Sequence, residues 1–239
     1  MGMEYLETVE EVLEREWTVE GIPVLSARVS LPRPAEADHD KGLRRIGRYY
    51  RQFCRSYIRY CERFLYPQAA EAFRQAAAAG SALPQYTAQL SYRVTCNQSG
   101  LWSLYADSRE RGLLPRPVRR GDTWDLRTGA PVPLGDFFPG RTALRRTLPD
   151  FAEAEIRRQL ESGSAAYRED WRRQLHKAFS AGNFYVTPEG LHFFYQMYAL
   201  APAVEGIPDF FLPWETLGAM PPARFLPPPL AEAGDSAGT

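Results

Sequence analysis

The chain has little of what usually reveals enzymatic chemistry. Its 239 residues include only three histidines, and none of them stands in a metal-ligand spacing. No Gly-x-Ser-x-Gly, Cys-x-x-Cys or His-Glu-x-x-His motif occurs, and no glycine-rich phosphate loop occurs. We therefore expect a protein that is not an enzyme and that uses no cofactor and no metal.

Net charge and long apolar runs are absent as well. Lys plus Arg equals Asp plus Glu, at 29 each, so no overall field attracts nucleic acid. No eighteen apolar residues follow one another, and the acidic N-terminus has no basic region followed by an apolar run. These patterns predict a cytoplasmic protein without a membrane span or a recognisable signal peptide.

Cysteine is scarce. The three thiols are Cys54, Cys61 and Cys96, an odd number in a chain without an export signal. This argues against a disulfide framework. We expect reduced thiols that pack as small hydrophobic side chains.

The chain does contain apolar residues with the periodicity of strands and with the periodicity of helices. Alternation predicts a hairpin over residues 12–31, strands over 85–107 and 123–126, and a second hairpin over 184–197. Spacings of three and four predict a helix from 43 to near Pro67, a second helix over 68–79, and helices over about 141–161 and 165–180. The expected fold is α+β, with antiparallel sheets packed against a few helices.

Two basic groups of residues stand out. The first is a stripe on the long helix, for which a solvated face is favoured over a site for an anionic polymer. It consists of Arg44, Arg48, Arg51, Arg55, Arg59 and Arg63. The second group lies in residues 109–120, which we expect to form a loop before the strand TWDL. Loops held by a sheet are common contact sites, so we predict partner binding by Arg116, Arg119, Arg120 and Trp124.

Each of the three histidines is expected to have a structural or solvent-exposed position and not a catalytic or metal-binding one. Asp40 is expected to cap a helix, which makes Asp38 and His39 a loop and not a metal site. His176 is expected on a solvated helix face. His192 is expected to be structural, and the alternative is an unrecognised enzyme that pairs His192 with Glu189 or Asp209.

The stretch GNFYVTPEGLHFFYQMY, residues 182–198, is dense in aromatic residues. Alternation places Leu191, Phe193, Tyr195 and Met197 on one apolar face and leaves a mixed face opposite. Aromatic side chains usually pack inward, so we favour a core role and keep a binding groove on the mixed face as the alternative.

Several separated motifs in the C-terminal half resemble a known family. They are DLRTG at 125–129, LGDFF at 134–138, FYVTPEGLHFFY at 184–195 and YALAP at 198–202. In these motifs the chain resembles the bacterial domain-of-unknown-function family found in the extracellular part of RsiV, a lysozyme-responsive anti-sigma factor, and beside PdaC-type polysaccharide deacetylases. The basic segment LPRPVRR replaces a Gly-Gly-Ala-His-like loop of that family, so contacts of that loop need not carry over.

The resemblance implies a non-catalytic α+β binding or regulatory module, with a protein or cell-wall-related ligand. It covers residues 84–217, which we take as the RsiV-like C-terminal domain. Residues 1–83 form an N-terminal part that we expect to be continuous with it. Residues 218–239 are rich in proline and then in small polar residues, and we expect a disordered tail.

Overall fold

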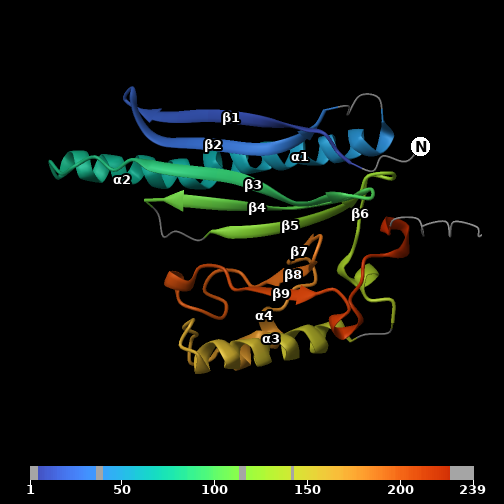
Figure 1. The fold of residues 1–239 in the computed structure, drawn as a ribbon. Helices are drawn as coiled ribbons and strands as arrows, with labels where there is room; N and C mark the ends of the chain where they lie inside the picture. Colours follow the sequence, from blue (N-terminus) through green and yellow to red (C-terminus); the bar gives the residue numbers. More distant parts are fainter. Residues whose placement is uncertain (1–4, 36–39, 113–116, 141–142, 227–239) are drawn as a thin grey trace, which may run out of the picture.

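The computed structural model describes residues 5–35, 40–112, 117–140 and 143–226, which form two sheets with flanking helices (Figure 1). The strands are β1 (Thr8–Val19), β2 (Ile22–Pro34), β3 (Tyr86–Gln98), β4 (Leu101–Arg111), β5 (Val118–Asp125), β6 (Ala130–Pro131), β7 (Phe184–Thr187), β8 (Gly190–Phe194) and β9 (Asp209–Pro213). The helices are α1 (Lys41–Tyr60), α2 (Tyr66–Ala78), α3 (Leu144–Glu161) and α4 (Trp171–Ala178). The predicted α+β class is confirmed.

The larger sheet has the strand order β1-β2-β3-β4-β5-β6, and the first hairpin is present as predicted. One pairing differs from the antiparallel expectation, because β2 and β3 run parallel. Parallel neighbours need a long crossover connection, which α1 and α2 supply along one face of the sheet (Figure 1). Leu43, Ile46, Tyr50 and Tyr57 of α1 are buried there against the strands.

The predicted boundary between the two helices near Pro67 is present, and it takes the form of a π-helical turn just before that proline. The chain passes from α1 to α2 through a π-helical turn, Cys61–Leu65, and the backbone N–H of Tyr66 donates to the carbonyl of Cys61. Pro67 falls in the first turn of α2, where a missing N–H leaves no helical hydrogen bond unmade. The second helix stops at Gly80 as predicted, with a φ of 62° that favours glycine.

The described part of the expected basic loop, residues 109–112 and 117–120, is mostly strand. Arg109 and Arg111 belong to β4, and Arg119 and Arg120 belong to β5. The two strands pair from Leu101 with Asp125 to Ser108 with Val118. Sequence reasoning assigned the arginines to a loop because they interrupt the apolar alternation. In the sheet Arg119 pairs with Asp107 on the neighbouring strand, and Arg120 lies near Phe53 of α1. These tertiary contacts outweigh the local signal.

The smaller sheet, β7-β8-β9, contains the predicted aromatic hairpin and packs against α3 and α4. Leu191, Phe193 and Tyr195 are fully buried on that side, which confirms the core interpretation of this face. Met197 lies beyond the end of β8 and is only half-buried. On the mixed face Phe194 is buried as well, so both sides of the ribbon pack.

The two sheets meet at the free edge of β7. The backbone N–H of Val186 donates to Ser103 Oγ at 3.0 Å, and Thr95 Oγ1 donates to the Val186 carbonyl at 2.7 Å. Both hydroxyls stand on the face of the larger sheet that lies away from α1. The larger sheet is therefore joined to the smaller sheet by hydrogen bonds between its hydroxyl side chains and the backbone of β7.

The first residues of the segment 218–239, expected as a disordered tail, pack against the smaller sheet and its helices. Ala219 and Phe225 are buried in the core that α3 and α4 cover. Residues 227–239 lie outside the described residues. Within the described ranges, no helix is long and apolar enough to span a bilayer.

Candidate functional site

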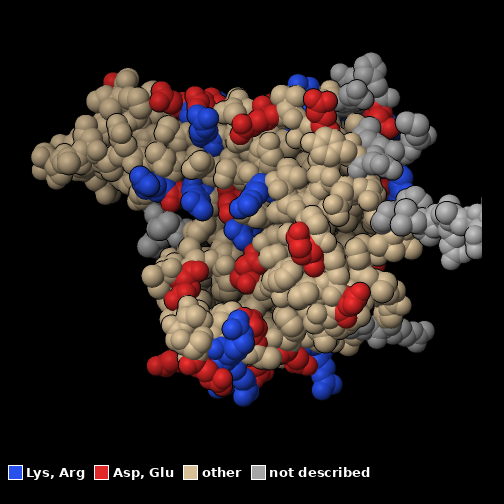
Figure 2. Space-filling model, viewed as in Figure 1, with Lys and Arg blue, Asp and Glu red and all other residues tan. Residues whose placement is uncertain are grey.

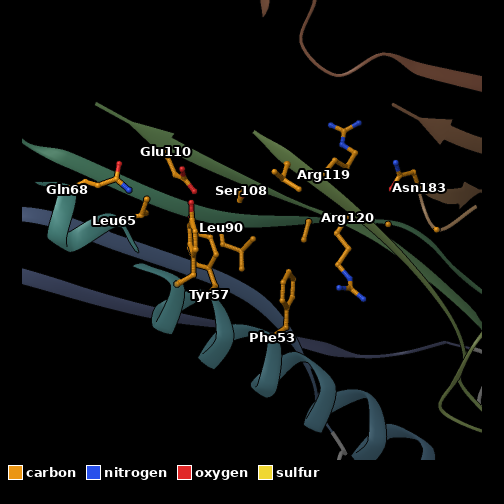
Figure 3. A pocket seen from close by; sticks show the side chains of 15 residues that line it. Phe53, Tyr57, Leu65, Gln68, Leu90, Ser108, Glu110, Arg119, Arg120 and Asn183 are labelled. Carbon is orange, nitrogen blue, oxygen red and sulfur yellow. The ribbon is translucent and has the colours of Figure 1, made fainter. Parts of the chain in front are cut away.

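Arg119 and Arg120 are neighbours on β5, and alternation sends their side chains to opposite faces of the sheet, as Figure 3 shows. Arg119 points toward the smaller sheet and Arg120 points toward α1. The two predicted contact residues therefore have different surroundings.

Arg119 is held between two carboxylates at the junction of the sheets. Its Nε donates to Asp107 Oδ1 at 2.9 Å, and its Nη2 donates to Asp107 Oδ2 at 3.0 Å. Its Nη1 donates to Asp209 Oδ2 at 2.9 Å. The guanidinium also lies 4.1 Å from the ring centroid of Tyr105. Only 15% of the side chain is exposed. These charge-assisted bonds hold the fold together and leave Arg119 few donors for a ligand.

His192 faces the same carboxylate. Its Nδ1 lies 2.8 Å from Asp209 Oδ1, and Tyr185 donates its hydroxyl to Asp209 Oδ2 at 2.8 Å. The imidazole is stacked on Tyr185, with ring centroids 4.7 Å apart, and the ring of Phe211 lies 4.9 Å away. Glu189, the other predicted partner, is exposed in the turn between β7 and β8. Of the two predicted carboxylates, Asp209 is thus the one that pairs with His192.

A second polar cluster lies on the α1 side of β5. Tyr49 donates to Asp122 Oδ1 at 2.9 Å, and Tyr50 donates to Asp122 Oδ2 at 3.3 Å. Trp124 Nε1 donates to the Tyr50 hydroxyl at 2.9 Å, and Trp124 is 4% exposed. Trp124 therefore packs inside the protein, where it contacts α1.

Burial raises the pKa of Asp122, although Arg120 and the two tyrosine hydroxyls counteract this effect. Burial and the charge of Asp122 likewise raise the pKa of Tyr49 and of Tyr50. The hydroxyls thus remain protonated donors at neutral pH. Arg120 closes the cluster, with its Nε 3.2 Å from Asp122 Oδ1.

Arg120 also borders an open cleft between α1 and the sheet, which we call the helix–sheet cleft. Its volume is about 1190 Å³, and aromatic rings of α1 form one wall (Figure 3). Small residues on β4, Ala106 and Ser108, leave the space opposite those rings. The guanidinium of Arg120 lies 5.4 Å from the ring of Phe53, and half of the arginine side chain is exposed.

Glu110 borders the other end of the helix–sheet cleft. Burial raises the pKa of Glu110, and a hydrogen bond with Tyr60 partly offsets this effect. Burial and the nearby Glu110 raise the pKa of Tyr60 to about 12. Leu65, from the π-helical turn, completes the wall beside them, and single π turns often occur at functional sites. The cleft can thus hold an apolar or aromatic group between a cation and a carboxyl group.

The remaining predicted residues are placed as follows. Arg116, Asp38 and His39 lie outside the described residues. Asp40 caps α1, accepting from the backbone N–H of Leu43 at 2.8 Å, as predicted. His176 lies half-exposed on α4, 3.6 Å from Asp150. In the described ranges, no group of His, Cys, Asp and Glu side chains is arranged to hold a metal ion.

The three cysteines are free thiols, as predicted. Burial, and to a lesser extent Glu110, raises the pKa of Cys61 to about 12. Burial raises the pKa of Cys96 to about 11. At neutral pH these two thiols carry almost no thiolate, which is the reactive form.

The residues that sequence reasoning missed are Phe53, Tyr57, Tyr60 and Glu110 of the helix–sheet cleft. Tyr57 and Phe53 were assigned to the apolar stripe of the helix, and nothing in the spacing shows that small β4 residues lie opposite. The six stripe arginines, in contrast, are exposed on α1 and the π turn, as the solvated interpretation predicts.

The C-terminal part of the chain is similar to a known family. Residues 135–215 match the family model described as a protein of unknown function, DUF3298. This match is shorter than residues 84–217, over which the RsiV-like resemblance extends. The description of the family names no activity. No curated protein matches the sequence.

Two solved structures share the fold over nearly the whole chain. One is a DUF3298 family member from Bacteroides fragilis, with a TM-score of 0.65 and 15% identity, covering 89% of this chain and 93% of that one. The other is a DUF3298 family protein from Pseudomonas aeruginosa, with a TM-score of 0.58 and 18% identity, covering 93% and 97%. At such identities the likeness concerns the fold alone.

Proposed function

We propose that this protein is a non-catalytic binding module that holds its ligand in the helix–sheet cleft. One observation carries the proposal: an open, aromatic-walled cleft of about 1190 Å³ has Arg120 at one end and Glu110 at the other. Concave apolar sites with a few polar groups are the usual form of a ligand site. The RsiV-like motifs suggest a protein or a cell-wall-related ligand.

The cleft favours a ligand with an apolar or aromatic group and an anionic group. The anionic group would pair with Arg120, whose guanidinium is held 5.4 Å from the ring of Phe53. The apolar group would contact Phe53, Tyr57 and Tyr60. Arg119 contributes to the cleft through its position in β5, while its charge is satisfied on the other face.

The dye 8-anilinonaphthalene-1-sulfonate, an aromatic anion, is a suitable first probe. We expect one dye molecule to bind per chain with enhanced fluorescence. Tyr60→Ala and Arg120→Ala should each weaken binding roughly tenfold, the effect of losing one stacked ring or one charge-assisted bond. Glu110→Gln should not weaken dye binding, because Glu110 can only repel the anionic dye and the substitution removes that repulsion. Arg51→Ala, on the exposed face of α1, is the matched control.

Displacement of the dye then distinguishes the ligand classes. Soluble peptidoglycan fragments and hen lysozyme would be titrated separately against the dye complex. Displacement by either one, lost in Arg120→Ala, supports the binding role and names the class. Dye binding that is equal in wild type, Tyr60→Ala and Arg120→Ala would disprove the role of the helix–sheet cleft.

A second candidate function rests on the His192–Asp209 pair. A histidine whose Nδ1 is held by a carboxylate is the arrangement of a general base, and Asp209 is positioned further by Tyr185 and Arg119. Rings on both sides of the imidazole favour a structural role instead. Hydrolysis of p-nitrophenyl acetate above the buffer rate, lost in both His192→Gln and Asp209→Asn, would support the hydrolase-like candidate over the binding module.

A further inference from the structure

A second cleft lies on the other side of the larger sheet. Its volume is about 1240 Å³. Strands β1 to β4 form its floor, and the segment after β8 forms a wall with Met197, Tyr198 and Ala203. We call it the open-face cleft. It shares Glu110 with the helix–sheet cleft, but the carboxyl group of Glu110 is directed toward α1 and Tyr60.

The strand register arranges the floor in two rows that cross the sheet. In the first row, Glu14 pairs with Arg28, Arg28 with Gln89, and Gln89 with Arg109. In the second row, the corresponding residues are Glu16, Ser26, Thr87 and Arg111. Each row therefore starts with a glutamate on β1 and ends with an arginine on β4. Three strand spacings separate the two ends, which is about 14 Å.

Three of the four charges at the ends of the rows are not neutralised within the described residues, and only Glu14 has an ion-pair partner. Arg28 pairs with Glu14 at 2.5 Å, in the middle of the floor. Arg109 and Arg111 are exposed and form no ion pair with any described residue, and the same holds for Glu16. Figure 2 shows the result on this side of the molecule: acidic side chains follow β1, and basic side chains gather over β3 and β4.

The wall of the open-face cleft is apolar, and the backbone of one of its residues, Tyr198, has an unusual conformation. Tyr198 has a φ of 67°, which few residues other than glycine adopt. Arg168 donates to the Tyr198 carbonyl at 3.2 Å, and Ala199 donates its N–H to the Gln196 carbonyl at 3.0 Å. These bonds hold the strained residue in place at the cleft. Backbone strain of this kind concentrates where a side chain must be presented to a ligand.

We propose that the open-face cleft binds a peptide segment of another protein in which acidic and basic residues are separated. Carboxylates of the segment lie at Arg109 and Arg111, and a lysine or arginine lies toward Glu16 and β1. An apolar residue between them contacts Met197 and Tyr198. The spacing of about 14 Å corresponds to roughly four extended residues.

The charge pattern argues against a uniform polyanion. A nucleic acid or a polyuronate lying across the floor would bring negative charges next to Glu14 and Glu16. Like charges brought together in a partly desolvated cleft oppose binding, whereas a segment of both signs is attracted at both ends. The inference does not depend on the helix–sheet cleft, because the two sites lie on opposite faces of the sheet.

A fluorescein-labelled peptide with two glutamates, two central leucines and two lysines tests the proposal by anisotropy. We expect saturable binding that weakens as NaCl rises from about 50 mM to about 500 mM. Arg109→Ala with Arg111→Ala should weaken binding roughly tenfold or more. Arg93→Ala is the matched control, since Arg93 is exposed on the same face of β3 but does not line the cleft.

Charge reversal provides the decisive comparison. The double variant Arg109→Glu with Arg111→Glu should lose the mixed peptide and gain a peptide that carries lysines at both ends. Unchanged far-ultraviolet circular dichroism and unchanged dye binding in the helix–sheet cleft show that the variant is folded. Tighter binding of polyglutamate or polygalacturonate than of the mixed peptide would overturn the proposal, and so would equal binding by wild type and both double variants.

Discussion

The guanidinium of Arg119 lies 2.9 Å from a carboxylate oxygen of Asp209, a residue 90 positions later in the chain. The same guanidinium binds both oxygens of Asp107 on the neighbouring strand β4. Arg119 thereby connects the larger sheet to the last strand of the smaller one. Arg119, for which the sequence predicts partner contact, is a principal polar link between the two layers.

Replacing Arg119 with alanine should lower the free energy of unfolding by about 3 kcal/mol, because the buried Asp107 and the partly buried Asp209 would lose their cation. Urea denaturation followed by tryptophan fluorescence measures the change. Arg93→Ala, on the exposed face of β3, should shift stability by no more than about 0.5 kcal/mol. Equal effects of the two substitutions would show that the Arg119 link contributes little.

Gly121 is required by the close approach of the two sheets. A Cβ atom at this position would lie 1.8 Å from the carbonyl oxygen of Phe184 on β7. We expect Gly121→Ala to separate the sheets and to lower stability by about 3 kcal/mol or more. Thermal unfolding monitored by circular dichroism tests this. Gly135→Ala, where a Cβ meets no atom within 4 Å, should leave the melting temperature almost unchanged.

Asp122 should make stability depend on pH in a direction opposite to that of an ordinary ion-paired carboxylate. Its pKa is raised in the folded protein, mainly by burial. A raised carboxyl pKa means that the folded state binds the proton more tightly, so this contribution to stability is largest in acid and is lost as pH rises through the folded pKa.

The variant Asp122→Asn isolates this effect. Its free energy of unfolding relative to wild type should improve as the pH rises above about 4, the ordinary pKa of an aspartate, and should level off above the folded pKa. Urea titrations of both proteins at several pH values provide the measurement. A difference between the two proteins that stays constant as the pH rises from about 4 would rule out a raised pKa for Asp122.

Tyr195 is fully buried, and its hydroxyl has no hydrogen-bond partner among the described residues. Burial also raises the pKa of this hydroxyl. Removing an unsatisfied buried hydroxyl should stabilise the fold, so we expect Tyr195→Phe to raise the free energy of unfolding by about 1 kcal/mol or more. Tyr50→Phe is a suitable comparison, because the Tyr50 hydroxyl bonds Asp122 and Trp124 and its loss should be destabilising.

Local patterns were enough to find most of the elements. The first hairpin, the strands after residue 85, helices α3 and α4 and the aromatic hairpin all follow from apolar spacing and from glycines such as Gly80. The capping role of Asp40 followed from its position before the helix. These features depend on interactions between residues that are close in sequence, and a pattern can record such interactions.

The sequence by itself determined the α+β class, the buried face with Leu191 and Phe193, and the free thiols. Only the tertiary structure decided that β2 and β3 run parallel, that a π-helical turn joins α1 to α2, and that Arg119 faces Asp209 while Arg120 faces Phe53. It also decided where the two clefts lie, because each is formed by segments distant in the chain. Pairing across such distances depends on the register of strands and on the volumes of facing side chains, and neither leaves a periodic signal in a single sequence.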